Sequence, residues 1–160
     1  MGALIQLLAC TGSQGPAGAG LLAEDFVAEE LFMEFVTTPD DTGEAQQILH
    51  LRSDSGLWSL RLGERWSEAE PQGQLAVALE EEGYKIDGAL VLPARLTVGQ
   101  TTEGTTVSAL GELEVWYGTF PMVASVEVSE GFDGAHHFAE GIGPVRLELY
   151  DRTWDLAYYE

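Results

Sequence analysis

The chain has 160 residues, with 27 acidic side chains against 7 basic ones and a formal net charge of −20. The basic residues are scattered, which excludes the clustered Lys/Arg face that binds nucleic acid or an anionic lipid surface. The length fits one domain with its own core, and the single cysteine excludes an internal disulfide and a multi-thiolate metal site.

The first ten residues, MGALIQLLAC, form a short apolar run that ends in a cysteine. Leu7-Leu8-Ala9-Cys10 resembles a bacterial lipobox, in which cleavage precedes the cysteine and the cysteine then carries the lipid. No basic residue precedes the run, and the run is short for an export leader, so an incidental cysteine is the alternative. We expect a leader over 1–10 that makes Cys10 the lipidation site, a flexible Gly/Ala/Pro tether over 11–20 and a single β-domain over 21–160.

The first half of that domain contains short runs in which apolar and polar residues alternate, a period of two that is typical of strands. A helical turn is predicted within 21–30. The polar stretch 64–73 contains Pro71 and is predicted to be mostly loop. The predicted strands cover 31–36, 47–53, 57–63, 74–80 and, as a pair turning at Asp87-Gly88, 84–92.

The second half shows the same alternation between glycines. Its predicted strands cover 103–110, 112–117, 121–129, 135–140 and a closing hairpin that turns at Asp151-Arg152. Breaks are predicted at Gly111 and at 118–120, and Trp154, Leu156 and Tyr158 are expected to point inward. The pattern predicts an all-β fold, a twisted antiparallel sheet curled into a half-barrel or sandwich, with at most one short N-terminal helix.

Residues 83–160 also carry a series of short motifs in a fixed order: Asp87-Gly88, Leu92-Pro93, Val98-Gly99-Gln100, Gly118-Thr119-Phe120 and the run from Phe138 to Glu148. In order and spacing they resemble a family of uncharacterised exported bacterial proteins, many of them lipoproteins. Pro144 and Thr101 depart from the pattern, which more often has an aliphatic residue and a tryptophan there. The resemblance implies a β-rich exported protein, a curved sheet like that of periplasmic lipoprotein carriers, and no catalytic residues to carry over.

The side chains capable of catalysis or metal binding do not form a recognisable motif in the sequence. His136 and His137 are adjacent, so in a strand they project to opposite faces and do not share a metal. Glu80-Glu81-Glu82 diverges in the same way. No nucleophile elbow, phosphate loop or zinc-protease motif is present. We therefore expect no catalytic residue, no metal and no cofactor.

Two hypotheses follow. The first is a non-catalytic domain of the cell envelope, periplasmic or anchored in the outer membrane, joined to a membrane through lipid on Cys10 and without nucleic-acid partners. The second is a carrier that holds an apolar or acyl ligand in the concave face of the sheet. The expected lining of such a concavity is Trp58, Trp116, Met122 and Trp154. The other interpretation of these four side chains is that they fill a solid core.

Overall fold

The computed structural model describes residues 20–37 and 46–160. The leader, Cys10 and nearly all of the predicted tether lie outside these residues. One 3-10 turn, η1 (Ala23–Phe26), confirms the predicted helical turn. The strands are β1 (Leu21–Leu22), β2 (Leu31–Thr37), β3 (Ile48–Asp54), β4 (Leu57–Leu62), β5 (Glu70–Glu80), β6 (Gly83–Ile86), β7 (Ala89–Pro93), β8 (Arg95–Leu96), β9 (Thr101–Thr102), β10 (Thr105–Val115), β11 (Gly118–Val128), β12 (Gly134–Ala139), β13 (Gly143–Leu149) and β14 (Arg152–Tyr159).

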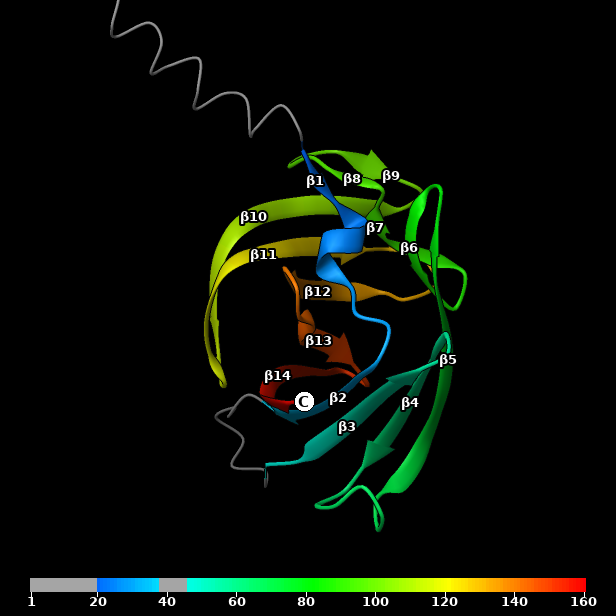
Figure 1. Ribbon diagram of the computed structural model, residues 1–160, viewed down its shortest axis with the longest axis vertical. Helices are drawn as coiled ribbons and strands as arrows, with labels where there is room; N and C mark the ends of the chain where they lie inside the picture. The colour runs from blue at the N-terminus through cyan, green and yellow to red at the C-terminus, as the bar shows by residue number, and fades with distance from the viewer. Residues whose placement is uncertain (1–19, 38–45) are drawn as a thin grey trace, which may run out of the picture.

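Twelve of these strands form one antiparallel sheet in the order β7-β6-β5-β4-β3-β2-β14-β13-β12-β11-β10-β9, while β1 and β8 pair separately. Every neighbour in the large sheet is also a neighbour in sequence, except where β2 pairs with β14. The chain is thus an up-and-down meander whose last strand returns to an early one, and the twisted sheet curls into a nearly closed barrel (Figure 1). The all-β antiparallel prediction is confirmed.

The barrel remains incomplete between β7 and β10. The edge strand β9 covers only the start of β10, through Thr101 and Thr102. Across the gap, the Thr105 hydroxyl of β10 donates a hydrogen bond to the Leu90 carbonyl of β7. We call this junction the seam. It is closed by side-chain contacts because no backbone ladder joins β7 to β10 within the described residues.

The interior is filled by side chains of the barrel itself. Alternate residues of each strand point inward, and η1 lies across one end of the barrel, where Phe26 is fully buried (Figure 1). Burial of one such side chain contributes about 1.5–3 kcal/mol. The largest fully buried side chains are Trp58, Trp154, Phe26, Phe35, Phe138, Met33, Leu49, Leu51, Ile86, Leu92, Leu147 and Leu156.

Four hairpins turn through two residues that are both left-handed, the geometry that matches the twist of paired strands. Three of them end in glycine: Ser55-Gly56, Asp87-Gly88 and Glu103-Gly104. The first, between the predicted strands 47–53 and 57–63, and the second confirm the sequence prediction. The fourth is Tyr150-Asp151, with φ of 56° and 60°, one residue earlier than predicted. A tyrosine there is strained because its Cβ crowds the backbone.

The predicted loop over 64–73 is wrong in its second part, since β5 already begins at Glu70. Pro71 is tolerated there because it lies at a register shift in the pairing with Arg61. On its other side β5 pairs with β6 only from Val77 onward. A proline without an N–H is accommodated at such a free edge or bulge.

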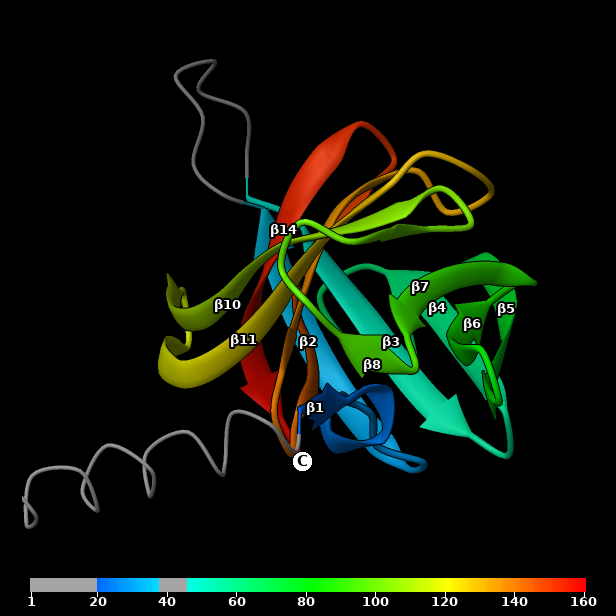
Figure 2. The ribbon, with the colours of Figure 1, turned by 90° about the horizontal axis from the view of Figure 1, so that it is seen from above.

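The breaks predicted at Gly111 and over 118–120 are also wrong, because β10 and β11 each run for 11 residues. The glycine adjoins a register shift between Gly111 and Leu113, and such bulges bend a strand without ending it. Both strands consequently curve, and their joined end extends past β14, away from β3–β7 (Figure 2).

Another register shift lies between Leu156 and Tyr158. It reverses the inward and outward positions at the end of β14, because side chains alternate with a period of two. Trp154 and Leu156 point into the core as predicted, but Tyr158 is 44% exposed and Tyr159 packs against the core instead. The predicted inward position of Tyr158 is therefore wrong.

Candidate functional site

The four predicted lining residues do not surround one cavity. Trp58 and Trp154 are each 1% exposed within the packed core, and Met122 is partly buried against it. Trp116 is 59% exposed, so its expected inward position is wrong. It lies in the two-residue turn between β10 and β11, where no sheet face is available to cover its ring.

A row of polar side chains crosses the outer face of four strands. Ser125, His137, Arg146 and Asp155 are successive cross-strand partners on β11, β12, β13 and β14. The Ser125 Oγ lies 2.7 Å from His137 Nδ1. Arg146 donates two hydrogen bonds to the Asp155 carboxylate, from Nε at 2.5 Å and from Nη2 at 3.0 Å. Because these residues alternate with buried ones such as Leu147, the row lies outside the core.

The row contains a serine beside a histidine. This pair is two of the three groups found where a histidine base activates a serine nucleophile. A third group must orient the base, but the carboxylate of Asp155 is held by Arg146 instead. Burial, followed by the positive charge of Arg146, lowers the pKa of His137. The hydrogen bonds to Asp155 raise the pKa of Arg146. The arrangement joins neighbouring strands through the His137–Ser125 contact and the Arg146–Asp155 pair.

His136 points the other way from His137, as predicted, and is fully buried. Its Nε2 lies 2.9 Å from the Phe132 carbonyl, and the Glu148 backbone N–H donates to its Nδ1 at 3.4 Å. Both ring nitrogens therefore have partners when the ring is neutral and carries its proton on Nε2. Burial lowers the pKa of His136, which favours the same neutral form.

A second buried histidine, His50, lies beside Trp66 on the outer face of β3. Its Nε2 is 2.8 Å from the Gly63 carbonyl, and its Nδ1 is 3.4 Å from Glu34 Oε1 without the alignment of a hydrogen bond. The Arg61 guanidinium lies 4.7 Å from the centre of the Trp66 ring, a cation–π distance. Sequence reasoning missed this cluster because Trp66 belongs to a polar stretch with no periodicity that would show it folding back.

Within 20–37 and 46–160, no three His, Cys, Asp or Glu side chains are grouped so that they could hold a metal ion. Among the same residues, no helix has the length and the apolar character that crossing a bilayer requires.

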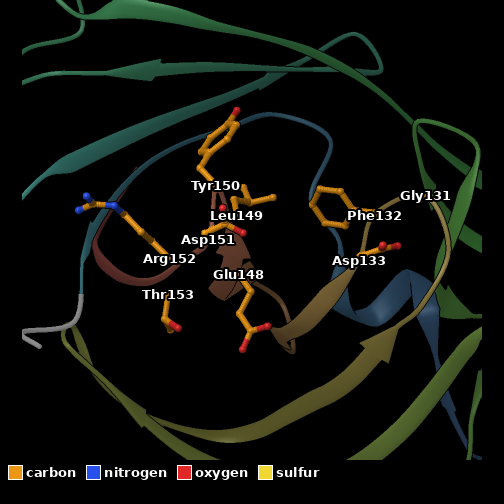
Figure 3. A pocket seen from close by; sticks show the side chains of 9 residues that line it. All are labelled: Gly131, Phe132, Asp133, Glu148, Leu149, Tyr150, Asp151, Arg152 and Thr153. Carbon is orange, nitrogen blue, oxygen red and sulfur yellow. The ribbon is translucent and has the colours of Figure 1, made fainter.

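One open depression, with a volume of about 570 Å³, lies between the loop at 131–133 and the β13–β14 hairpin. Asp133, Glu148 and Asp151 make it acidic. Figure 3 shows the Tyr150 and Arg152 side chains pointing away from Glu148, so the lining groups do not converge on one point. The strained turn at Tyr150 forms one wall of this depression.

A second depression, of about 720 Å³, opens at the mouth of the barrel beside η1. Val77 and Leu79 share the inner face of β5 with core-facing residues, because they pair with Ile86 and Tyr84, but they are only partly covered. Burial raises the pKa of Tyr84. Three carboxylates belong to the same lining: Glu24, Glu29 and Glu30. We call this depression the mouth groove.

A third surface feature lies where the β10–β11 turn meets the end of β14, two segments that both carry exposed aromatic residues. We call it the aromatic patch: Trp116, Tyr117, Tyr158 and Tyr159. The Tyr117 and Tyr159 rings have centroids 5.0 Å apart. Trp116, Tyr117 and Tyr158 are 59%, 49% and 44% exposed. An exposed apolar group of this kind is typical of an interaction surface.

The chain matches no protein-family model, no curated protein and no solved structure.

Proposed function

We propose that this protein is a non-catalytic β-domain of the bacterial cell envelope, joined to a membrane through lipid on Cys10, and that it acts by binding. The observation that supports a binding role is that side chains with catalytic potential serve to hold strands together. Ser125 is bonded to His137, Asp155 is held by Arg146, and both nitrogens of His136 have backbone partners.

Two features of the sequence support the location. Leu7-Leu8-Ala9-Cys10 resembles a lipobox, and the tether that follows would separate a folded domain from its lipid. The motifs over 83–160 resemble those of exported bacterial proteins. A single acyl chain gives only marginal membrane binding, so stable attachment would require a second chain or a second contact.

Metabolic labelling tests the anchor. The full-length chain, expressed in a bacterial host supplied with radioactive palmitate, should carry label and fractionate with membranes. The Cys10→Ala variant should carry none and should appear in the soluble fraction. Equal labelling of the two proteins would disprove the anchor. It would leave a binding role for the folded domain to be tested separately.

The mouth groove favours a second candidate function, a carrier of an apolar ligand. Val77 and Leu79 are inner-face side chains that the core covers only in part, so an acyl chain lying against them would extend the packed interior. Native mass spectrometry after mild extraction tests this function. A co-purifying lipid that is lost in Leu79→Glu would support it, and a bare protein mass in repeated preparations would contradict it.

A further inference from the structure

The turn between β10 and β11 is fixed in place by contacts with two other strands. The Tyr117 backbone N–H donates to the Leu156 carbonyl at 2.7 Å. From β13, the neighbour of β14, Arg146 Nη2 donates to the Glu114 carbonyl at 3.4 Å. The Tyr117 ring also stacks on Phe120 with an interplanar angle of 19°. A hairpin end held in this way presents its neighbouring side chains with little conformational freedom.

Trp116 contributes little to folding, because more than half of its surface remains exposed to water. Rigidly presented Trp and Tyr side chains are the residues most enriched among the energetically dominant positions of protein interfaces. They lose little conformational entropy on binding, since the presenting backbone is already fixed. The geometry therefore suits recognition of a macromolecular surface better than enclosure of a small ligand.

The charges around the aromatic patch define the partner. Glu112 and Glu114 precede the turn and are exposed. Glu160 lies close enough to Tyr158 to accept a hydrogen bond from its hydroxyl at 3.3 Å, and the charge of Glu160 is the main cause that raises the pKa of Tyr158. The Glu34 carboxylate contributes in the same direction. A complementary surface has to carry positive charge beside apolar groups.

We propose that the aromatic patch is the docking surface for a protein partner whose contact segment carries arginine or lysine beside apolar side chains. This inference rests on the proposed binding function and names its surface. Arginine is suited to both features of the patch, since its guanidinium pairs with carboxylates and stacks on a tryptophan face. A second copy of the chain is disfavoured, because two surfaces of the same molecule with a net charge of −20 repel one another.

Fluorine NMR of the protein labelled with 5-fluorotryptophan tests this directly, because the four tryptophans give separate signals. Trp116→Phe assigns the signal of Trp116. The probe is the peptide Arg-Val-Arg-Tyr-Arg-Val-Arg-Tyr, and its control has glutamate in place of every arginine. The Trp116 signal should shift saturably with the arginine peptide, and the signals of Trp58, Trp66 and Trp154 should stay in place. The glutamate peptide should produce no shift.

Variants separate the patch from general attraction to an acidic protein. Combined Glu112→Gln and Glu114→Gln substitutions should weaken binding of the arginine peptide about tenfold. Tyr150→Asn removes another exposed tyrosine near carboxylates and should leave binding unchanged. An equal loss in Tyr150→Asn would overturn the proposal.

Three further results would overturn the proposal. The first is a shift confined to the Trp66 signal, and the second is a Trp116 signal that responds to phosphatidylcholine vesicles but not to the arginine peptide. The third is a Trp116 signal that moves with protein concentration alone. None of these results depends on Cys10, so the proposed anchor is tested independently.

Discussion

Arg146 and Asp155 form a two-point ion pair between β13 and β14, in which only 8% of the Asp155 side chain is exposed. Arg146 reaches further, to the Glu114 carbonyl of β10. One guanidinium thus joins two strands of the barrel wall to the curved end of a third. Its planar group of donors can satisfy both acceptors at once.

Arg146→Ala should lower the free energy of unfolding by about 3 kcal/mol, because it leaves a nearly buried carboxylate without its partner. Arg146→Lys should lose less, since it keeps the charge but only one donor group. Urea unfolding monitored by tryptophan fluorescence measures both. Arg65 is exposed, and Arg65→Ala should stay within about 0.5 kcal/mol of the parent protein. Equal effects of Arg146→Ala and Arg65→Ala would disprove the role of the pair.

Trp154→Ala should destabilise the protein by about 3–5 kcal/mol, as expected when a large buried ring is replaced by a methyl group. It also removes the hydrogen bond from Trp154 Nε1 to the Leu149 carbonyl, which measures 2.9 Å. Trp116→Ala is the matched control and should change stability by no more than about 0.5 kcal/mol. Thermal melts of the two variants decide this, and an unshifted melt for Trp154→Ala would refute its core position.

Gly83 allows β6 to pass close to β7. A Cβ at this position would lie 2.0 Å from the Leu92 carbonyl oxygen, and φ is 138°. Gly83→Ala should therefore force the two strands apart and cost about 2–5 kcal/mol. Gly99→Ala has a left-handed φ but open space around the new methyl group, so it should cost only about 1 kcal/mol. Chemical denaturation should show a larger loss in the free energy of unfolding for Gly83→Ala than for Gly99→Ala.

The turn at Tyr150-Asp151 should be improvable. Replacing it with Asn-Gly supplies the residues that adopt two left-handed conformations without strain. The double variant should gain about 0.5–1.5 kcal/mol in the free energy of unfolding. Ser55→Asn, in a turn that already ends in glycine, should change little. A loss of stability in the double variant would show that the Tyr150 side chain supports the fold.

Acid should weaken the fold through His136 and His137. Burial lowers the pKa of both below the ordinary value of 6.5, so the unfolded chain takes up protons at a pH where the folded chain does not. Stability is therefore fully present above pH 6.5 and decreases as the pH falls toward the lower pKa values of the folded state. His137→Gln should reduce this decrease between pH 7.5 and 5.5 in urea titrations. An unchanged pH dependence would contradict the assignment.

The strands and most hairpin turns could be predicted because each depends on local information. Dipeptides such as Asp87-Gly88 specify a turn by their conformational preference, and alternation specifies a face. The errors arose where tertiary context overrode that information. The bulge after Leu156 reversed Tyr158 and Tyr159, and Gly111 bent a strand that it was expected to end. Trp116 was assigned inward from its apolarity, although the decisive fact is its position in a turn. The aromatic patch could not be predicted, since its members meet only after β10 and β11 curve back to β14.

The pairing of β2 with β14 has a consequence for how the chain folds. It places Phe35 beside Leu156, whereas the other pairings of the large sheet join strands that follow one another along the chain. Two meanders, β2–β7 and β9–β14, can thus form from short-range contacts at low loop-closure cost. Joining them requires the opposite ends of the domain to find each other. We expect that encounter to limit the folding rate, because contacts of large sequence separation are the slow ones.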